Sequence, residues 1–134
     1  MILLDTHVVA HYVTDDTRLG RHARATIKRA LARNAVFVSA ISFWEIAMLV
    51  ARGRFKLKES LRAFRATILG KGIQELPVNT EIAMAAGELP RQHDDPADRM
   101  IVATAMERGF TLLTADEALL MWRMSGYRTL DESA

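Results

Sequence analysis

Four carboxylate residues stand where predicted strands end or predicted helices begin, and such side chains can gather around a cation. They are Asp5, Glu45, Asp98 and Asp116. Like charges in one crevice repel, and each raises the pKa of its neighbours unless a cation neutralises them. A site of oxygen ligands alone suits hard divalent ions such as Mg²⁺ or Mn²⁺. Such an ion can lower the pKa of a bound water and stabilise charge on a transferring phosphoryl group.

One of these carboxylates, Asp98, lies near the start of the helix that is easiest to predict. Pro96 suits a first helical position because its φ is fixed and its missing N–H is not needed there. Asp95 is then the N-cap, and capping alone is a sufficient explanation for it. Asp98 lies within the positive end of the helix dipole, where it is either a complement to the dipole or a metal ligand. We expect this helix to run to Arg108 and to stop at Gly109.

The elements that must position the carboxylates alternate between strands and helices. Strands are predicted at residues 2–4, 36–38, 73–76, 110–114 and 127–130, and helices at 6–13, 19–34, 39–53, 61–69, 80–89, 96–108 and 115–124. Continuous apolar strands alternating with helices predict a parallel sheet covered on both faces. Pro77 makes 73–76 an edge strand. The fold class is therefore α/β, with one three-layer α/β/α domain over residues 1–134 and four or five short strands.

This topology predicts that the four carboxylates meet. Ligands of such sheets collect beyond the carboxyl ends of the strands. Asp5 directly follows the first strand, and Asp116 comes two residues after the fourth. Asp98 opens the helix that leads into the fourth strand, and Glu45 lies in the first turn after the second. For Glu45 a capping box with Ser42 is the competing interpretation.

Composition narrows the class of protein. The chain has 134 residues, half of them hydrophobic, and no cysteine. Disulfides and thiolate zinc sites are excluded, and a reducing compartment is favoured. We find no predicted signal peptide or membrane span. These observations predict a soluble cytoplasmic protein.

Charge is distributed unevenly. Residues 17–71 hold thirteen Lys or Arg against two Glu, and residues 72–134 hold five basic against eleven acidic residues. A basic segment beside an acidic one suggests an anionic partner next to a cation site. Solvated helix faces are the alternative for any single lysine.

Three other polar features invite a functional interpretation. His7 and His11 are four residues apart on a predicted helix, but without a third ligand nearby we expect surface or hydrogen-bonded histidines. His93 and Asp94 are similar to the dyad of metal-dependent phosphohydrolases, an all-helical class that the predicted strands oppose. Arg99 is expected to pair with a neighbouring carboxylate, and a direct contact with phosphate is the alternative.

Four motifs together resemble the PIN-domain ribonucleases, in particular the VapC-type toxins of bacterial toxin–antitoxin pairs. They are Leu3-Leu4-Asp5-Thr6-His7, the segment from Ser39 to Ala47, Asp95-Pro96-Ala97-Asp98-Arg99 and Thr114-Ala115-Asp116. The resemblance implies a catalytic and metal-binding quartet of Asp5, Glu45, Asp98 and Asp116. Supporting positions are Thr6, Asp95, Arg99 and Thr114.

We therefore expect a Mg²⁺- or Mn²⁺-dependent endoribonuclease in which a metal-activated water attacks the phosphodiester, leaving 5′-phosphate and 3′-hydroxyl ends. Arg52, Arg54 and Lys56 of the basic segment are predicted to contact RNA phosphates. The resemblance further implies a homodimer and a cognate antitoxin. The alternative is a catalytically silent PIN-like module that binds RNA or protein, which the intact quartet opposes.

Overall fold

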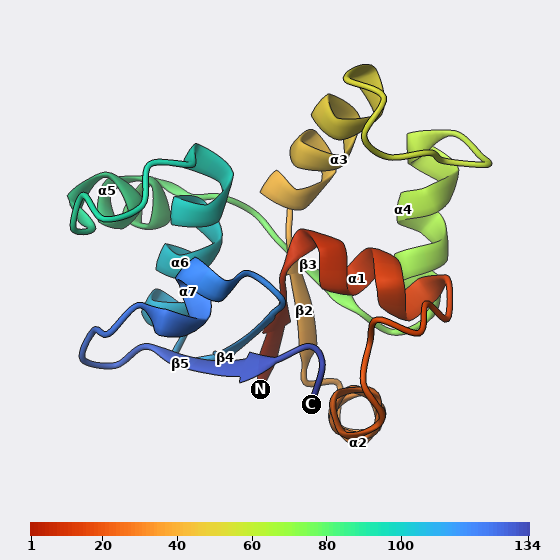
Figure 1. Cartoon of the computed structure of the whole chain (residues 1–134), viewed down its shortest axis with the longest axis horizontal. Coiled ribbons are helices and arrows are strands. Elements are labelled where there is room, and N and C mark those ends of the chain that lie inside the picture. Colours follow the sequence, from red (N-terminus) through yellow and green to blue (C-terminus); the bar gives the residue numbers. More distant parts are fainter.

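Five short strands form one parallel sheet at the centre of the computed structural model, which describes all 134 residues (Figure 1). They are β1 (Ile2–Leu4), β2 (Val36–Ser39), β3 (Gln74–Leu76), β4 (Thr111–Thr114) and β5 (Arg128–Asp131). Their order is β3-β2-β1-β4-β5, and every neighbouring pair is parallel. The predicted α/β class and the edge position of β3 are confirmed.

Seven helices connect or follow the strands. They are α1 (Thr6–Val13), α2 (Arg21–Leu31), α3 (Ile41–Ala51), α4 (Leu61–Gly70), α5 (Thr80–Glu88), α6 (Pro96–Arg108) and α7 (Glu117–Met121). The prediction for α7 was too long, because Asp116 is its N-cap and Trp122 already has an extended backbone. The prediction for α2 was also too long at both ends. No helix has both the length and the apolar character that crossing a membrane requires.

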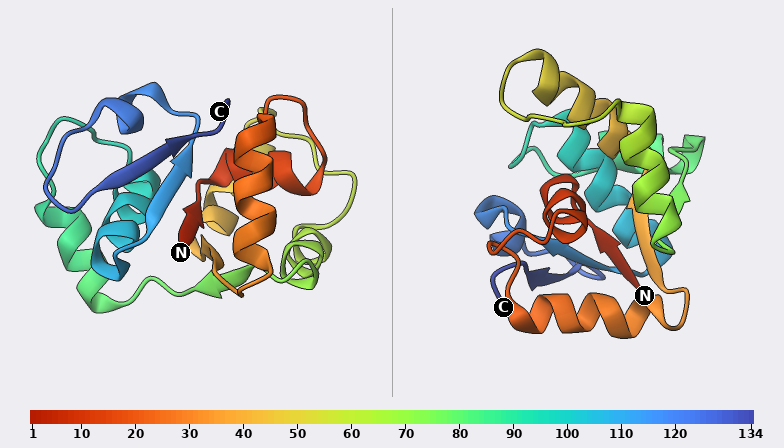
Figure 2. Two further views of the ribbon diagram at one scale, coloured as in Figure 1. Left: turned by 90° about the horizontal axis from the view of Figure 1, so that it is seen from below. Right: turned by 90° about the vertical axis from the view of Figure 1, so that its right-hand side faces the viewer.

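Successive side chains of each strand point to opposite faces of the sheet, and helices pack against both faces. Ile2 and Leu4 of β1 pack in a core cluster with residues of α1, α2 and α4. Leu3, between them, points to a second cluster that includes residues of α6 and α7. A period of two is expected of strand side chains, and here both faces are apolar because both are covered. Figure 2 shows the resulting layers from two further directions.

The helix α6 begins and ends as its sequence predicts. Asp95 is the N-cap and accepts a hydrogen bond from the backbone N–H of Asp98 at 3.0 Å. Pro96 stands in the first helical position, and Gly109 ends the helix with a φ of 68°. A left-handed residue after the last turn is most easily supplied by glycine. The first turn of α6 is thereby fixed next to the carboxyl ends of β1 and β4.

Candidate metal centre

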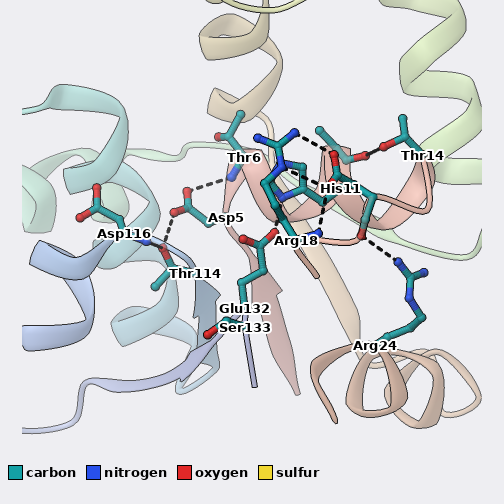
Figure 3. A network of polar contacts seen from close by, with 12 residues as sticks. Asp5, Thr6, His11, Thr14, Arg18, Arg24, Thr114, Asp116, Glu132 and Ser133 are labelled. Atoms are coloured by element: carbon teal, nitrogen blue, oxygen red, sulfur yellow. Dashed lines mark hydrogen bonds and ion pairs between the residues drawn. The ribbon is translucent and has the colours of Figure 1, made fainter. Parts of the chain in front are cut away.

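Asp5 is held at the end of β1 by two hydrogen bonds, one to each carboxylate oxygen. Its Oδ1 accepts from the backbone N–H of Thr6 at 2.8 Å, and its Oδ2 accepts from the hydroxyl of Thr114 at 2.6 Å (Figure 3). The same hydroxyl accepts from the N–H of Asp116 at 3.0 Å. Asp5 is only 6 % exposed. Since both partners are fixed by secondary structure, the direction of this buried carboxylate is fixed too.

Glu45 extends from the second turn of α3, one turn later than predicted, and carries a buried oxygen, Oε1, without any hydrogen-bond partner. The capping-box interpretation is wrong. The helix starts at Ile41, so Ser42 lies inside it, buried, and accepts a 2.9 Å hydrogen bond from the Thr6 hydroxyl. A buried carboxylate oxygen that lacks a donor is costly to the fold and is a suitable ligand for a cation.

Asp98 lies in the first turn of α6 and is paired with a residue that the sequence did not suggest for this site. Its Oδ2 is 2.7 Å from Nε2 of His93, in the loop before the helix. The sequence drew attention to His93 only as part of a dyad with Asp94, but Asp94 is exposed. The separation of five residues across a loop gave no periodic signal that could have revealed this contact.

The quartet converges as two overlapping groups. Oxygen atoms of Asp5, Glu45 and Asp98 all lie within 4.8 Å of one another. Asp98 and Asp116 also form a group with a ring nitrogen of His93, within the same distance. Asp98 belongs to both groups. The convergence that the topology predicted is therefore present in this structure, with a histidine in addition.

The electrostatics of the centre suit a cation. Burial raises the pKa of Asp5, and burial together with the charges of Asp5 and Asp95 raises the pKa of Glu45. Burial, followed by the charges of Asp5, Asp95 and Glu45, raises the pKa of Asp98 to about 7. Groups that resist ionisation for lack of a counter-charge are stabilised as carboxylates by a divalent ion. The orphaned Oε1 of Glu45 and the oxygen-rich donor set both fit Mg²⁺ or Mn²⁺.

The carboxylates line a cleft of about 620 Å³ that also contains two of the three predicted RNA-binding residues. Arg52 and Arg54, at the end of α3 and just beyond it, line this cleft together with Trp44. Lys56 instead lines a separate cavity beside Phe55 and Phe64. The predicted basic trio is thus divided between two places.

Arg99 does not pair with a carboxylate, so that prediction is wrong. Its guanidinium donates to backbone carbonyl oxygens at the end of α5 and in the loop that follows, at distances from 2.7 to 3.4 Å. Carbonyls at a helix end have no partners within the helix, and an arginine fork can satisfy several of them at once.

The histidines of α1 have separate surroundings. His11 is buried and its Nδ1 is hydrogen-bonded to Oε1 of Glu132, as Figure 3 shows. His7 is exposed and lines the cleft. Neither joins the groups of possible metal ligands, in agreement with the expectation of surface or hydrogen-bonded histidines.

Comparisons with known proteins agree with this architecture. A family model described as PIN domain matches residues 2–121. The chain is 33 % identical to Ribonuclease VapC22 of Mycobacterium tuberculosis over 119 residues, which is 88 % of each chain. Among solved structures, VapBC2 from Rickettsia felis bound to a promoter DNA fragment aligns with a TM-score of 0.72 and 17 % identity, over 98 % of each chain. A toxin–antitoxin complex from Klebsiella pneumoniae aligns with a TM-score of 0.60 and 17 % identity, over 95 % of each chain.

Proposed function

The chain belongs to the PIN domain family, and on this basis we propose that it is a metal-dependent endoribonuclease, the toxin of a toxin–antitoxin pair. One observation carries the proposal beyond the family. Glu45 keeps a buried carboxylate oxygen without a donor, within 4.8 Å of oxygens of Asp5 and Asp98. A fold that only bound RNA or protein would gain nothing from three carboxylates that repel one another.

Asp5, Glu45 and Asp98 would hold the ion in this proposal, and Asp116, which lies near Asp98, would be a further ligand. A bound Mg²⁺ or Mn²⁺ supplies a water of lowered pKa and a counter-charge for the phosphoryl oxygens. Thr114 and the N–H of Thr6 orient Asp5, and Asp95 caps the helix that presents Asp98. Attack of this water on the phosphodiester, with the 3′-oxygen as the leaving group, would give products with 5′-phosphate and 3′-hydroxyl ends.

Arg52 and Arg54 contact the phosphates of the RNA in this proposal. Both are exposed and line the same cleft as the carboxylates, so a strand that reaches the carboxylates passes close to them. Phosphate contacts provide affinity and register without reading sequence. Lys56 lines the separate cavity, so it contributes less to RNA binding in this proposal.

An antitoxin partner is supported by the solved relatives, several of which are toxin–antitoxin complexes. We propose that this chain binds an antitoxin that covers the cleft and that it forms a homodimer. Trp44 lines that cleft and is 51 % exposed, which suits an apolar contact with a partner. RNA as substrate and the absence of cysteine favour action in the cytoplasm.

The decisive experiment combines a metal titration with RNA cleavage. Purified protein is incubated with total bacterial RNA at increasing Mg²⁺ or Mn²⁺, and the ends of the products are mapped. We expect metal-dependent cleavage that Asp5→Asn abolishes and that Glu107→Gln, an exposed residue of α6, leaves unchanged. A protein that binds RNA but neither cleaves it nor binds metal through these carboxylates would be the silent module instead.

A further inference from the structure

The His93 side chain is directed toward the metal centre by a short hydrogen bond. Its Nε2 lies 2.7 Å from Oδ2 of Asp98, and the two side chains are 19 % and 14 % exposed. In the ionised state that binds a metal, the Asp98 carboxylate can only accept, so Nε2 of His93 donates. The contact is more sheltered than an ordinary surface pair, and it occupies one of the two oxygens of Asp98.

The loop that carries His93 is itself fastened by Arg99, the residue after Asp98. The guanidinium donates to the carbonyls of Leu89 and His93 at 2.7 Å each, and to that of Pro90 at 3.0 Å. A closed ring results. From Asp98 it follows the backbone to Arg99, crosses to the carbonyl of His93, and returns through the imidazole to the Asp98 carboxylate.

A third support comes from the segment after α7. The ring of Trp122 lies 6.0 Å from that of His93, centroid to centroid, at an angle of 39°. Trp122 is almost completely buried and belongs to the core cluster beneath α6. The imidazole is therefore restrained on one side by packing, in addition to its hydrogen bond.

His93 could serve the centre either as a ligand or as a group that orients a ligand. A histidine bound to metal ordinarily anchors its other ring nitrogen on a carboxylate or carbonyl. Nδ1 of His93 makes no hydrogen bond within the protein, and the bond from Nε2 goes to Asp98 itself. We propose that His93, with its loop fastened by Arg99, is a positioning residue that fixes the Asp98 carboxylate for metal binding.

This role rests on the proposed function in one respect, namely that Asp98 binds the ion. Its consequence is specific. Asp98 belongs to both groups of possible ligands, so losing its orientation weakens both. Loss of a residue that orients a metal ligand commonly lowers metal affinity about 10- to 100-fold.

The test measures Mn²⁺ binding to the metal-free protein by electron paramagnetic resonance, without RNA. His93→Ala is expected to bind Mn²⁺ about 10- to 100-fold more weakly than wild type. His93→Gln should recover most of the affinity, because the side-chain amide of Gln can place an N–H near the position of Nε2. His22→Ala, which removes an exposed histidine of α2, is the matched control and should bind like wild type. If His93→Ala does not fold, His93→Asn takes its place, because its amide is one methylene too short.

Three results would overturn the proposal. The first is wild-type affinity in His93→Ala or His93→Asn. The second is a His93→Gln variant that binds as weakly as the shortened side chains. The third is a nitrogen hyperfine coupling from Mn²⁺ that disappears in His93→Gln, since that identifies a direct ligand. If the wild type itself binds no Mn²⁺, the proposed metal site fails and the role of His93 fails with it, whereas the first three results leave the metal site in place.

Discussion

The hydroxyl of Thr114 donates a 2.6 Å hydrogen bond to Oδ2 of Asp5 and so joins the ends of two neighbouring strands, β4 and β1, that are 109 residues apart in sequence. The N–H of Asp116 donates to the same hydroxyl, so the donor direction of the hydroxyl toward Asp5 is fixed. One threonine side chain thereby orients the most deeply buried carboxylate of the centre. The contact also opposes the effect of burial on the pKa of Asp5.

Replacing Thr114 with Val should therefore weaken both the fold and the centre. Val has nearly the same shape as Thr, but Oδ2 of Asp5 and the N–H of Asp116 lose their hydrogen-bond partner. This loss costs about 1–3 kcal/mol of unfolding free energy. We also expect weaker Mn²⁺ binding near neutral pH, because the Asp5 carboxyl would ionise less readily. Urea denaturation and a Mn²⁺ titration measure the two effects. Thr114→Ser, which restores the hydroxyl, should recover both; a Val variant indistinguishable from wild type would contradict this account.

The parts of the centre that the sequence revealed are those tied to regular structure. Asp5 and Asp116 could be placed because each follows a short apolar run that is typical of a buried strand in a chain where strands and helices alternate. Asp98 could be placed because Asp95 and Pro96 mark a helix start. In each case the local pattern and the tertiary structure agree.

The parts that the sequence did not reveal depend on loops and burial. The pairing of His93 with Asp98 requires the loop after α5 to fold back, which Arg99 achieves through backbone carbonyls that a sequence does not distinguish. Ser42 and Glu45 have the spacing of a capping box, yet the helix begins one residue before Ser42 and burial decides their surroundings. Charge complementarity suggested a carboxylate partner for Arg99, but its guanidinium instead donates to backbone carbonyls at the end of α5 and in the loop that follows.

Asp98→Asn should stabilise the metal-free protein at high pH. The pKa of Asp98 is raised to about 7 from an ordinary 3.8, mainly by burial. Between these values the folded protein holds a proton that the unfolded chain has released, so this group's contribution to stability falls as the pH rises from about 4 to 7. Asn removes the charge, and we expect a gain on the order of 1–3 kcal/mol at pH 8 that shrinks toward pH 5.

Thermal melts in chelator across this pH range give the comparison. Asp94→Asn is the matched control, because Asp94 is exposed and four residues away in sequence. Its profile should run parallel to that of wild type. A parallel profile for Asp98→Asn as well would show that Asp98 is not strained by its surroundings.

The three basic residues predicted to bind RNA should differ in their contribution according to the cavity that each one lines. Arg52 and Arg54 line the cleft of the carboxylates, whereas Lys56 does not. The double variant Arg52→Gln/Arg54→Gln should bind RNA more weakly and reduce the slope of log affinity against log salt by about 0.7 for each lost contact with a single strand. Lys56→Gln should change the slope little. Fluorescence anisotropy in chelator measures binding without cleavage, and equal slopes for the double variant and wild type would place the RNA elsewhere.

The last prediction concerns Glu45, whose Oε1 is buried and unpaired at the wall of the cleft. Gln has the same size and keeps an oxygen, but it lacks the negative charge that attracts a hard divalent cation. Because burial and the charges of Asp5 and Asp95 raise the pKa of Glu45, the neutral amide should leave the metal-free fold as stable as wild type or slightly more stable. Mn²⁺ affinity and Mn²⁺-dependent RNA cleavage should both fall at least tenfold, and Glu107→Gln on the exposed face of α6 should change neither. Should Glu45→Gln bind Mn²⁺ and cleave RNA like wild type across a range of metal concentrations, the ion is held by the three aspartates alone.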